Sequence, residues 1–281
     1  MITPEQEDRL RAILREGGLL TVLTGAGISA ESGIPTFRGP EGYWTVGSQV
    51  YHPQEMATLQ MFRRNPDDVW QWYLHRATVC RRATPNAGHL ALMELEKLMG
   101  EDFRLVTQNV DDLHLRAGNS PERTYQIHGN VFFMRCAAEC RPDLHPLPPD
   151  LIGRDKNRPL RADEERQLTC PDCGGRTRPH VLWFDEIYNE HQFRFRSSLQ
   201  AAAATRLLIV VGTSGATNLP NQVAWTVLQN GGTIFDVNIA PNPFSQLAQQ
   251  SRNGAFFQMP SSRFLPEFVT LVDHLQSAGC N

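Results

Sequence analysis

Short apolar runs recur along the chain, with helical patterns between several of them. Four runs have the length and composition of buried strands: residues 19–23, 103–107, 206–211 and 233–237. Strands that alternate with helices favour an α/β fold with a doubly wound, mostly parallel sheet. Ligands of such sheets bind in a crevice beyond the carboxyl ends of the strands. The pattern therefore predicts where a ligand site lies before any motif is considered.

Polar residues follow each of the four runs. They are Thr24-Gly25, Gln108-Asn109-Val110-Asp111, Gly212-Thr213-Ser214 and Asn238. Any one of these ends could be an ordinary loop, but four polar ends along one edge of a sheet are harder to explain in that way. We expect them to converge on one crevice that forms the active site.

Two stretches interrupt the strand pattern. In residues 52–83, Asn65-Pro66-Asp67-Asp68 combines a cap residue, a proline at the first helical position and acids in the first turn, which predicts a helix from there. A second helix is expected to begin at Thr84-Pro85. Residues 136–178 are rich in Pro, Arg, Asp and Cys with little apolar periodicity, so they could not bury a core unaided.

The composition is that of an ordinary soluble globular protein, with 281 residues of which 41% are apolar and 20% charged. A net charge of −3 gives no indication of bulk nucleic-acid or membrane binding. No apolar run reaches the roughly eighteen residues of a membrane span, and the acidic N-terminus does not resemble a signal or transit peptide. We therefore expect a cytoplasmic protein.

The residues after the first run have the spacing of a phosphate-binding turn. Gly25, Gly27 and Ala30 fit the G-x-G-x-x-G/A pattern, in which glycine permits a tight turn and a close approach of the backbone to a pyrophosphate. The same spacing also occurs in ordinary strand-to-helix turns. The acidic residue that usually binds the ribose has no obvious counterpart, because residues 32–44 read as a Gly/Pro-rich loop. A dinucleotide would therefore be held differently from the way a dehydrogenase holds it.

Four of the six cysteines form two close pairs, Cys136 with Cys140 and Cys170 with Cys173. In a chain without an export signal, paired cysteines are more often metal ligands than disulfides. Four thiolates with no open position suit a structural zinc ion. A disulfide, free thiols and a nucleic-acid-binding zinc ribbon are the alternatives, and the many acids of the intervening loop argue against the ribbon.

Taken together, these motifs resemble those of the sirtuins, the NAD-dependent protein-lysine deacylases. The resemblance is carried, in order, by Gly25–Ser29, Gly33–Arg38, Thr107–Asp111, Ile127–Gly129, the four cysteines and Gly212–Ser214. It spans roughly residues 18–270. It implies a Rossmann-like NAD-binding domain (residues 1–51, 84–135 and 177–281), a helical insertion (52–83) and a zinc-binding module (136–176), with the acyl-lysine entering the cleft between them.

The resemblance also implies the chemistry. The acyl oxygen attacks C1′ of the nicotinamide ribose, nicotinamide leaves, and His128 acts as general base on a ribose hydroxyl, for which a pKa near neutrality would suit. The products would be lysine, nicotinamide and an O-acyl-ADP-ribose. Asn109 and Asp111 complete the expected catalytic set, although Asn and Asp also commonly cap strand ends. A lone histidine, likewise, is more often structural.

A larger set of residues is implied to contact NAD. Phe37 would shield the reacting ribose carbon, Arg38 would lie near the phosphates, and Gln108 would orient the ribose hydroxyls. The full set is Gly25, Ala26, Gly27, Ser29, Ala30, Thr36, Phe37, Arg38, Trp44, Gln108, Asn109, Val110, Asp111, Gly212, Thr213, Ser214, Asn238, Ile239, Ala240 and Ser261.

Two residues of the helical insertion are expected to bind the acyl group. Tyr73 and Arg76 are three apart on the expected helix and therefore share a face. They resemble the Tyr-x-x-Arg pair of class III sirtuins, which remove succinyl and malonyl groups, and Ala57 matches the small residue of that pocket. A guanidinium can bind a terminal carboxylate through two hydrogen bonds. The alternative is that the pair is only the rim of a packed helix. Val181, Trp183 and Phe184 are also expected to contact substrate.

Three departures from the family pattern bear on the substrate. Asp185 stands where glycine is usual, residues 216–220 differ from the usual apolar-proline segment, and the acid common after Asn238 is missing. The sequence predicts a desuccinylase and demalonylase with weaker deacetylase activity, a monomer acting on acyl-lysine proteins with NAD and zinc. An NAD hydrolase or ADP-ribosyltransferase on the same fold is the alternative, and an NAD-sensing binding module is a third.

Overall fold

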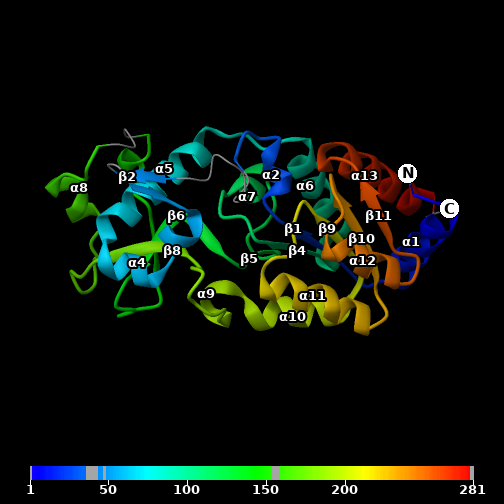
Figure 1. The fold of residues 1–281 in the computed structure, drawn as a ribbon. Helices are drawn as coiled ribbons and strands as arrows, with labels where there is room; N and C mark the ends of the chain where they lie inside the picture. Colours follow the sequence, from blue (N-terminus) through cyan, green and yellow to red (C-terminus); the bar gives the residue numbers. More distant parts are fainter. Residues whose placement is uncertain (1, 36–43, 47–48, 154–157, 279–281) are drawn as a thin grey trace.

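A six-stranded parallel sheet forms one end of the molecule (Figure 1). The computed structural model describes residues 2–35, 44–46, 49–153 and 158–278. The strand order is β11-β10-β9-β1-β4-β5. The strands are β1 (Leu19–Thr24), β4 (Phe103–Thr107), β5 (Thr124–Gln126), β9 (Thr205–Val211), β10 (Thr233–Asn238) and β11 (Ala255–Gln258). The four predicted runs are confirmed as β1, β4, β9 and β10. Strand β11 is a short, partly exposed edge strand that the apolar pattern does not predict.

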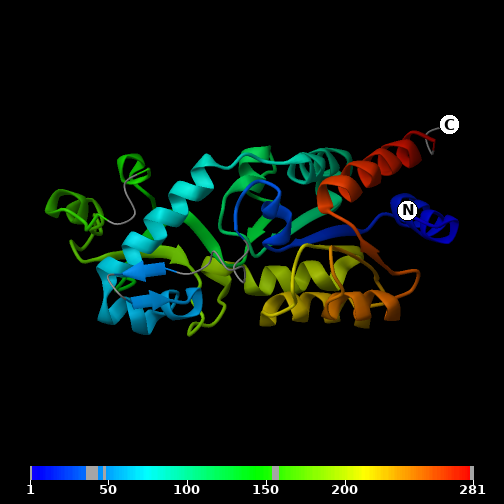
Figure 2. The same cartoon turned by 45° about the horizontal axis from the view of Figure 1, so that its top comes forward.

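Helices cover both faces of this sheet (Figures 1 and 2). One face packs against α1 (Pro4–Glu16), α6 (Ala87–Met99) and α13 (Ser261–Ala278). The other packs against α10 (Phe195–Ala204), α11 (Asn218–Gln229) and α12 (Pro243–Gln250). Because both faces are covered, the central strands are buried along nearly their whole length and do not alternate between buried and exposed positions. This is the doubly wound arrangement that the sequence predicts. Short elements complete this part, namely α2 (Gly27–Ala30), α7 (Leu113–Ala117), α9 (Glu190–Phe193) and the 3-10 turn η2 (Gly100–Asp102).

The other end of the molecule has its own hydrophobic core. A three-stranded antiparallel sheet of order β7-β6-β8 consists of β7 (Leu144–Pro146), β6 (Gly129–Cys136) and β8 (Thr177–Val181). Around it lie α3 (Pro53–Met56), α4 (Leu59–Arg64), α5 (Pro66–Arg82), α8 (Ala162–Gln167), the turn η3 (Pro149–Leu151) and the hairpin of β2 (Trp44–Val46) with β3 (Gln49–Tyr51). The indole of Trp70 on α5 donates a hydrogen bond to the Thr177 carbonyl at 3.1 Å, so the helix and the sheet are joined inside this core.

Two sequence expectations differ from the structure in their boundaries. The second helix begins at Ala87 instead of Thr84-Pro85, because the Asn86 side chain accepts hydrogen bonds from the backbone of Gly88 and His89 and so caps α6. Strands β6 and β8 pair in the three-stranded sheet, whereas the predicted domain boundaries place residues 129–135 and 177–181 with the NAD-binding domain. The first expected helix begins at Pro66, as predicted. Among the described residues, none of the helices combines the length and the apolar character needed to cross a bilayer.

Candidate active site

The carboxyl ends of β1, β4, β9 and β10 are linked to one another by backbone hydrogen bonds. Gln108 donates to the Thr24 carbonyl at 3.0 Å, Gly25 to the Val211 carbonyl at 3.0 Å, and Gly212 to the Val237 carbonyl at 3.0 Å. The polar residues that follow these strands are therefore neighbours, as the sequence predicts. We refer to residues 24–30, 108–111, 128, 212–214 and 238 as the strand-end cluster.

The glycines of the first turn serve a contact between two loops. Gly27 donates a hydrogen bond to the Gly212 carbonyl at 2.8 Å. A Cβ on Gly27 would lie 2.7 Å from the Gly212 Cα, closer than any side chain tolerates. The sequence argument assigned these glycines to a close approach of a pyrophosphate, whereas the structure requires them first for the packing of the two loops.

Asn109, Asp111 and Ser29 form a buried hydrogen-bond network. The Asn109 amide donates to the Gly25 carbonyl at 3.0 Å and to Ser29 Oγ at 3.1 Å, and Ser29 Oγ donates to Asp111 Oδ2 at 2.7 Å. Burial raises the pKa of Asp111, and the bonds from Leu113 and Ser29 oppose that rise. The second oxygen of Asp111 accepts from the Leu113 backbone at 2.9 Å, so the capping role noted as the alternative is also present.

Two buried histidines that no motif indicated lie near this network, His89 against Ser29 and His114 against the His89 ring, with ring centroids 4.9 Å apart. Asn86 N–H donates to His89 Nδ1 at 3.3 Å, so the neutral ring carries its proton on Nε2, which faces Ser29 Oγ at 3.4 Å. Burial lowers the pKa of His89 to about 4 and that of His114 well below the usual value. Both rings are therefore neutral near pH 7. In the sequence, His89 could be noticed only as the third residue after the helix cap Asn86. Many helices have such a residue, so this position does not identify a site residue.

His128 lies just after β5, and both of its ring nitrogens are engaged. Nδ1 is 3.0 Å from the Gln108 carbonyl oxygen, and Nε2 is 2.7 Å from the Tyr188 hydroxyl. A Cβ on Gly129, where φ is +84°, would lie 2.1 Å from the His180 carbonyl oxygen, so only glycine allows β8 to pass this close to His128. Burial lowers the pKa of His128 to about 4, and the bond to Gln108 opposes the fall. The expectation of a pKa near neutrality is therefore corrected.

The other residues predicted to contact NAD lie in or around the strand-end cluster, and they range from buried to exposed. Gln108 Nε2 donates to Thr213 Oγ1 at 2.8 Å, and Asn238 Nδ2 donates to the Thr213 carbonyl at 2.9 Å. Exposed members are Ala30, Ser214, Ile239 and Ala240; partly buried ones are Ala26 and Val110. Ser261 is buried at the start of α13, next to Gly88. Thr36, Phe37 and Arg38 lie outside the described residues, and for Trp44 only its place in β2 is described.

Four of the residues predicted to contact the acyl group belong to the hydrophobic core around the three-stranded sheet: Ala57, Tyr73, Val181 and Trp183. The other two do not, since Phe184 is 55% exposed and Arg76 is half-buried. Trp183 Nε1 donates to the Tyr73 hydroxyl at 2.9 Å. The Arg76 guanidinium lies over the Trp72 ring, 5.1 Å from its centroid. Ala57 is buried, and its carbonyl accepts from the Phe184 backbone at 3.0 Å. Tyr73, Trp183, Val181 and Ala57 thus lie in one cluster.

Asp185, a departure from the family pattern, joins the helical insertion to the segment after β8. Its carboxylate accepts from the backbone of Leu59 at 2.7 Å and of Gln60 at 3.1 Å, in the first turn of α4. These are N–H groups that a helix leaves unpaired, and a carboxylate there is favourable. The charge at position 185 is therefore used inside the molecule, and it fixes Phe184 beside Ala57.

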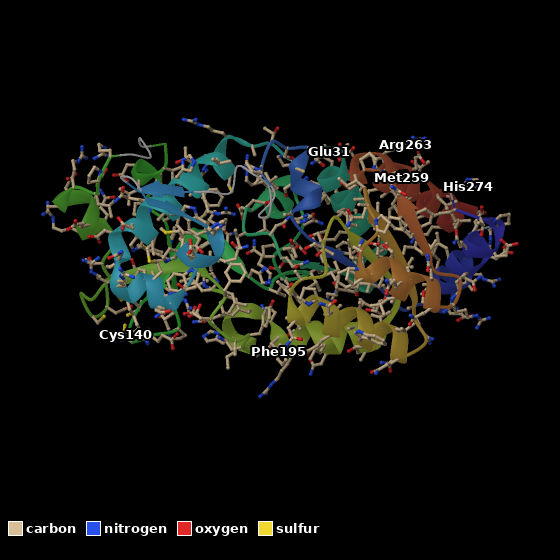
Figure 3. All side chains as sticks on the ribbon, in the orientation of Figure 1. Glu31, Cys140, Phe195, Met259, Arg263 and His274 are labelled. Atoms are coloured by element: carbon tan, nitrogen blue, oxygen red, sulfur yellow. The ribbon has the colours of Figure 1, made fainter. Side chains whose placement is uncertain are left out.

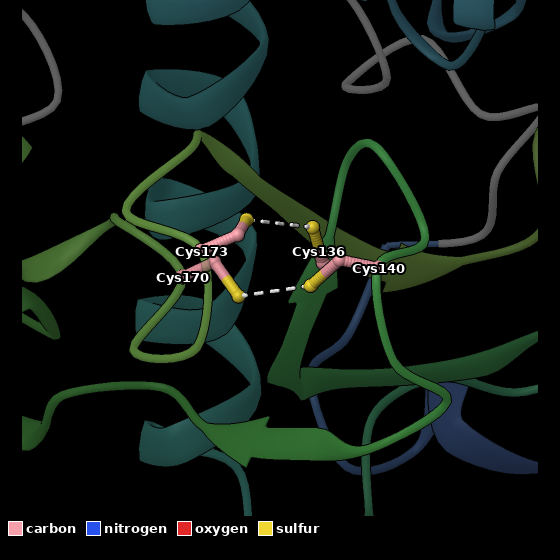
Figure 4. A group of neighbouring side chains, drawn as sticks. All are labelled: Cys136, Cys140, Cys170 and Cys173. Atoms are coloured by element: carbon pink, nitrogen blue, oxygen red, sulfur yellow. Dashed lines mark hydrogen bonds between the residues drawn. The ribbon is translucent and has the colours of Figure 1, made fainter.

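The four cysteines Cys136, Cys140, Cys170 and Cys173 converge, and we refer to them as the cysteine cluster (Figure 4). Their sulfurs all lie within 4.8 Å of one another, with Cys136 to Cys173 and Cys140 to Cys170 at 3.6 Å. A disulfide needs about 2.05 Å, whereas a tetrahedral zinc with bonds of about 2.3 Å separates its sulfurs by about 3.8 Å. Although burial acts to raise it, backbone bonds from Cys140 and Ala138 lower the pKa of Cys136 to about 7. The cluster fits zinc. In Figure 3, Cys140 lies at the opposite end of the molecule from His274 on α13.

Comparisons with known proteins point to one family. Residues 25–218 match the Sir2 family. An NAD-dependent protein deacylase from Leptospira interrogans serogroup Icterohaemorrhagiae serovar Lai (strain 56601) is 37% identical over 257 residues, which cover 89% of this chain and 91% of that protein. A crystal structure of a Sir2 homologue in complex with NAD has a TM-score of 0.78 at 32% identity, covering 99% of this chain and 97% of that one. A Sir2 structure with a p53 peptide and NAD⁺ has a TM-score of 0.72 at 25% identity, covering 100% of both chains.

Proposed function

The chain belongs to the Sir2 family, and we propose that this NAD-dependent protein deacylase removes succinyl and malonyl groups from protein lysines faster than acetyl groups. The observation that carries the preference is the position of Arg76. It lies three residues after Tyr73 on α5, over the Trp72 ring at 5.1 Å, and its charge opposes the rise that burial causes in the pKa of Asp111. A cation of the helical insertion therefore lies within electrostatic reach of the strand-end cluster.

The chemistry of Tyr73 supports the same substrate. Burial raises its pKa far above the ordinary value, so the phenol stays protonated. Because Trp183 donates to its oxygen, the Tyr73 hydroxyl hydrogen is directed to another acceptor. A phenol that donates and a guanidinium that donates twice suit a terminal carboxylate, and Ala57 contributes a small side chain to the same core as Tyr73.

The strand-end cluster supplies the groups that the deacylase reaction needs. NAD, when bound, supplies the ribose carbon that receives the acyl oxygen and the nicotinamide that leaves. His128, neutral and protonated on Nδ1, would take a proton from a ribose hydroxyl at Nε2. Asn109 and Asp111 would hold the nicotinamide amide and its ribose, and Gln108 would orient the ribose hydroxyls.

The outer residues of the cluster suit the rest of the dinucleotide. Ser214 follows the end of β9 and Asn238 is the last residue of β10, and Gly212 with Thr213 presents backbone groups beside Gly25 and Gly27. We assign these positions to the phosphates and the adenosine. The cysteine cluster has no open ligand position, so zinc would stabilise the segment of residues 136–176 and take no part in the reaction.

Replacing Arg76 by methionine tests the acyl preference. Losing a charge-assisted hydrogen bond should lower kcat/KM for a succinyl-lysine peptide by about 10- to 100-fold, and that for the matched acetyl peptide by less than about threefold. Peptide mass and O-acyl-ADP-ribose are followed together. Arg82, exposed on the same helix α5, provides the matched control Arg82→Met.

If Arg76→Met lowered kcat/KM equally for both peptides, the proposed carboxylate pocket would be rejected, while the deacylase activity itself would stand. Faster acetyl than succinyl turnover by the unaltered enzyme would contradict the preference itself. NAD consumed to free ADP-ribose without any peptide change would replace the deacylase by an NAD hydrolase.

The low pKa of His128 predicts an unusual pH profile. A general base works when it is neutral, and a pKa of about 4 keeps His128 neutral at pH values where an ordinary histidine, near 6.5, is protonated. We expect kcat/KM for NAD, which reports the free enzyme, to stay level down to about pH 5. Fluorescence at each pH checks that the protein remains folded. If kcat/KM of the unaltered enzyme instead fell to half near pH 6.5, and the residual activity of His128→Ala showed no such fall, this pKa would be contradicted.

We also propose that the enzyme is a cytoplasmic monomer acting on acyl-lysine proteins. The net charge of −3 supports neither nucleic acid nor a membrane surface as a partner. Sedimentation of the purified protein tests the oligomeric state, and cell fractionation tests the location.

A further inference from the structure

The proton on the His128 ring is placed by its neighbours. A carbonyl oxygen accepts only, so the contact of Nδ1 with the Gln108 carbonyl at 3.0 Å requires a proton on Nδ1. The neutral ring then has a single lone pair for hydrogen bonding, on Nε2. The Tyr188 hydroxyl, 2.7 Å away, donates to that lone pair. The nitrogen that would accept the substrate's proton is therefore already occupied in the ligand-free protein.

Tyr188 lies between β8 and α9, in a segment without regular secondary structure. Its ring stacks on Phe195, with centroids 6.3 Å apart and planes at 23°; Phe195 is labelled at the start of α10 in Figure 3. Burial raises the pKa of Tyr188 to about 12, and the neighbouring Thr217 hydroxyl opposes the rise. Tyr188 is thus a protonated donor at any pH at which the enzyme works.

Thr217 connects this pair to a second member of the strand-end cluster. Its hydroxyl donates to Gln108 Oε1 at 2.8 Å. Tyr188 and Thr217 together therefore hold His128 and Gln108, although neither belongs to the motifs that carry the family resemblance. Thr217 lies in the 216–220 segment and Tyr188 comes three residues after Asp185, so both stand near positions where this chain departs from the family.

We propose that Tyr188 is a positioning residue that caps Nε2 of His128 in the ligand-free enzyme and yields that nitrogen to a ribose hydroxyl when NAD binds. The inference rests on the proposed function, which makes His128 the base. One lone pair cannot accept from the phenol and from the ribose at once. Because Thr217 gives its own proton to Gln108, its Oγ1 can accept from the phenol once the phenol leaves Nε2. The neighbouring Ile187, which is 86% exposed, does not hold the segment in place.

Tyr188→Phe tests the cap. The variant keeps the ring on Phe195 and removes only the hydroxyl. Because a neutral hydrogen bond no longer has to be given up, NAD should bind about three- to tenfold more tightly in calorimetry without peptide. KM for NAD should fall by the same factor, with kcat at or above that of the unaltered enzyme.

Tyr125→Phe is the matched control, since both ring nitrogens of His128 bond other groups and the Tyr125 hydroxyl bonds neither. We expect it to change neither value. A tenfold or larger fall in kcat of Tyr188→Phe with unchanged NAD affinity would overturn the cap and make the phenol a proton relay. Unchanged kcat and NAD affinity would overturn it as well. The calorimetry needs no deacylation, so failure of the proposed activity, seen as no product from any acyl peptide, is separate from failure of the cap.

Discussion

Replacing His128 by alanine is expected to lower kcat for lysine deacylation by about 100- to 10,000-fold, the usual contribution of a general base. NAD should still bind, because Asn109, Asp111 and Ser29 form their network without His128. Product formation is measured as O-acyl-ADP-ribose, and NAD affinity by calorimetry. A fall in turnover together with retained affinity places His128 in the chemical step.

His191→Ala is the control for this substitution, because His191 is an exposed histidine on α9. It should leave turnover and NAD affinity unchanged. Near-normal turnover by His128→Ala would end the assignment of the base. Loss of NAD binding equal to the loss of turnover would give His128 a binding role instead.

Disrupting the cysteine cluster is expected to have the largest effect on stability. Cys173 is exposed, so Cys173→Ser removes a zinc ligand with little loss of packing. Structural zinc sites contribute on the order of 10 kcal/mol in small peptides, so the variant should lose its metal and its Tm should fall by about 10 °C or more. Metal analysis and calorimetry measure both effects.

Cys80→Ala separates the metal from the thiol. Cys80 is buried on α5, away from the cysteine cluster, so this variant should lose some stability through packing but keep one zinc per chain. Zinc content that is the same in Cys173→Ser and in the unaltered protein would contradict the site. A disulfide between cluster cysteines, found by mass spectrometry without reduction, would contradict it too.

The sequence was most informative where local pattern and chemistry coincide. Strand β4 (Phe103–Thr107) has the predicted bounds, because a short, mostly apolar run between a helix and a polar turn has few other solutions. The cysteines are similar, since four sulfurs in two close pairs suit few structures other than a metal site. In both cases the residues that decide the structure are near one another in the chain.

Contacts between residues far apart in the chain could not be predicted from the sequence. His128 and Tyr188 are 60 positions apart, and Leu59 and Asp185 are 126 apart. Asp185 could be recognised as a departure, but its role as a cap for α4 depends on where the segment after β8 passes the helical insertion. The His128 pKa follows the same rule, because burial is a property of the assembled fold.

The sequence by itself therefore determined four strands of the sheet (β1, β4, β9 and β10), the set of residues at their ends and the cysteine cluster, because periodicity, strand-end chemistry and ligand type are local properties. The tertiary structure alone decided which hydrogen bonds hold those residues. It left the His128 ring neutral with its proton on Nδ1, gave Gly27 and Gly212 a packing role, and placed the Tyr188 hydroxyl on Nε2. Such properties arise from burial and from contacts between elements far apart in the chain, which no local pattern contains.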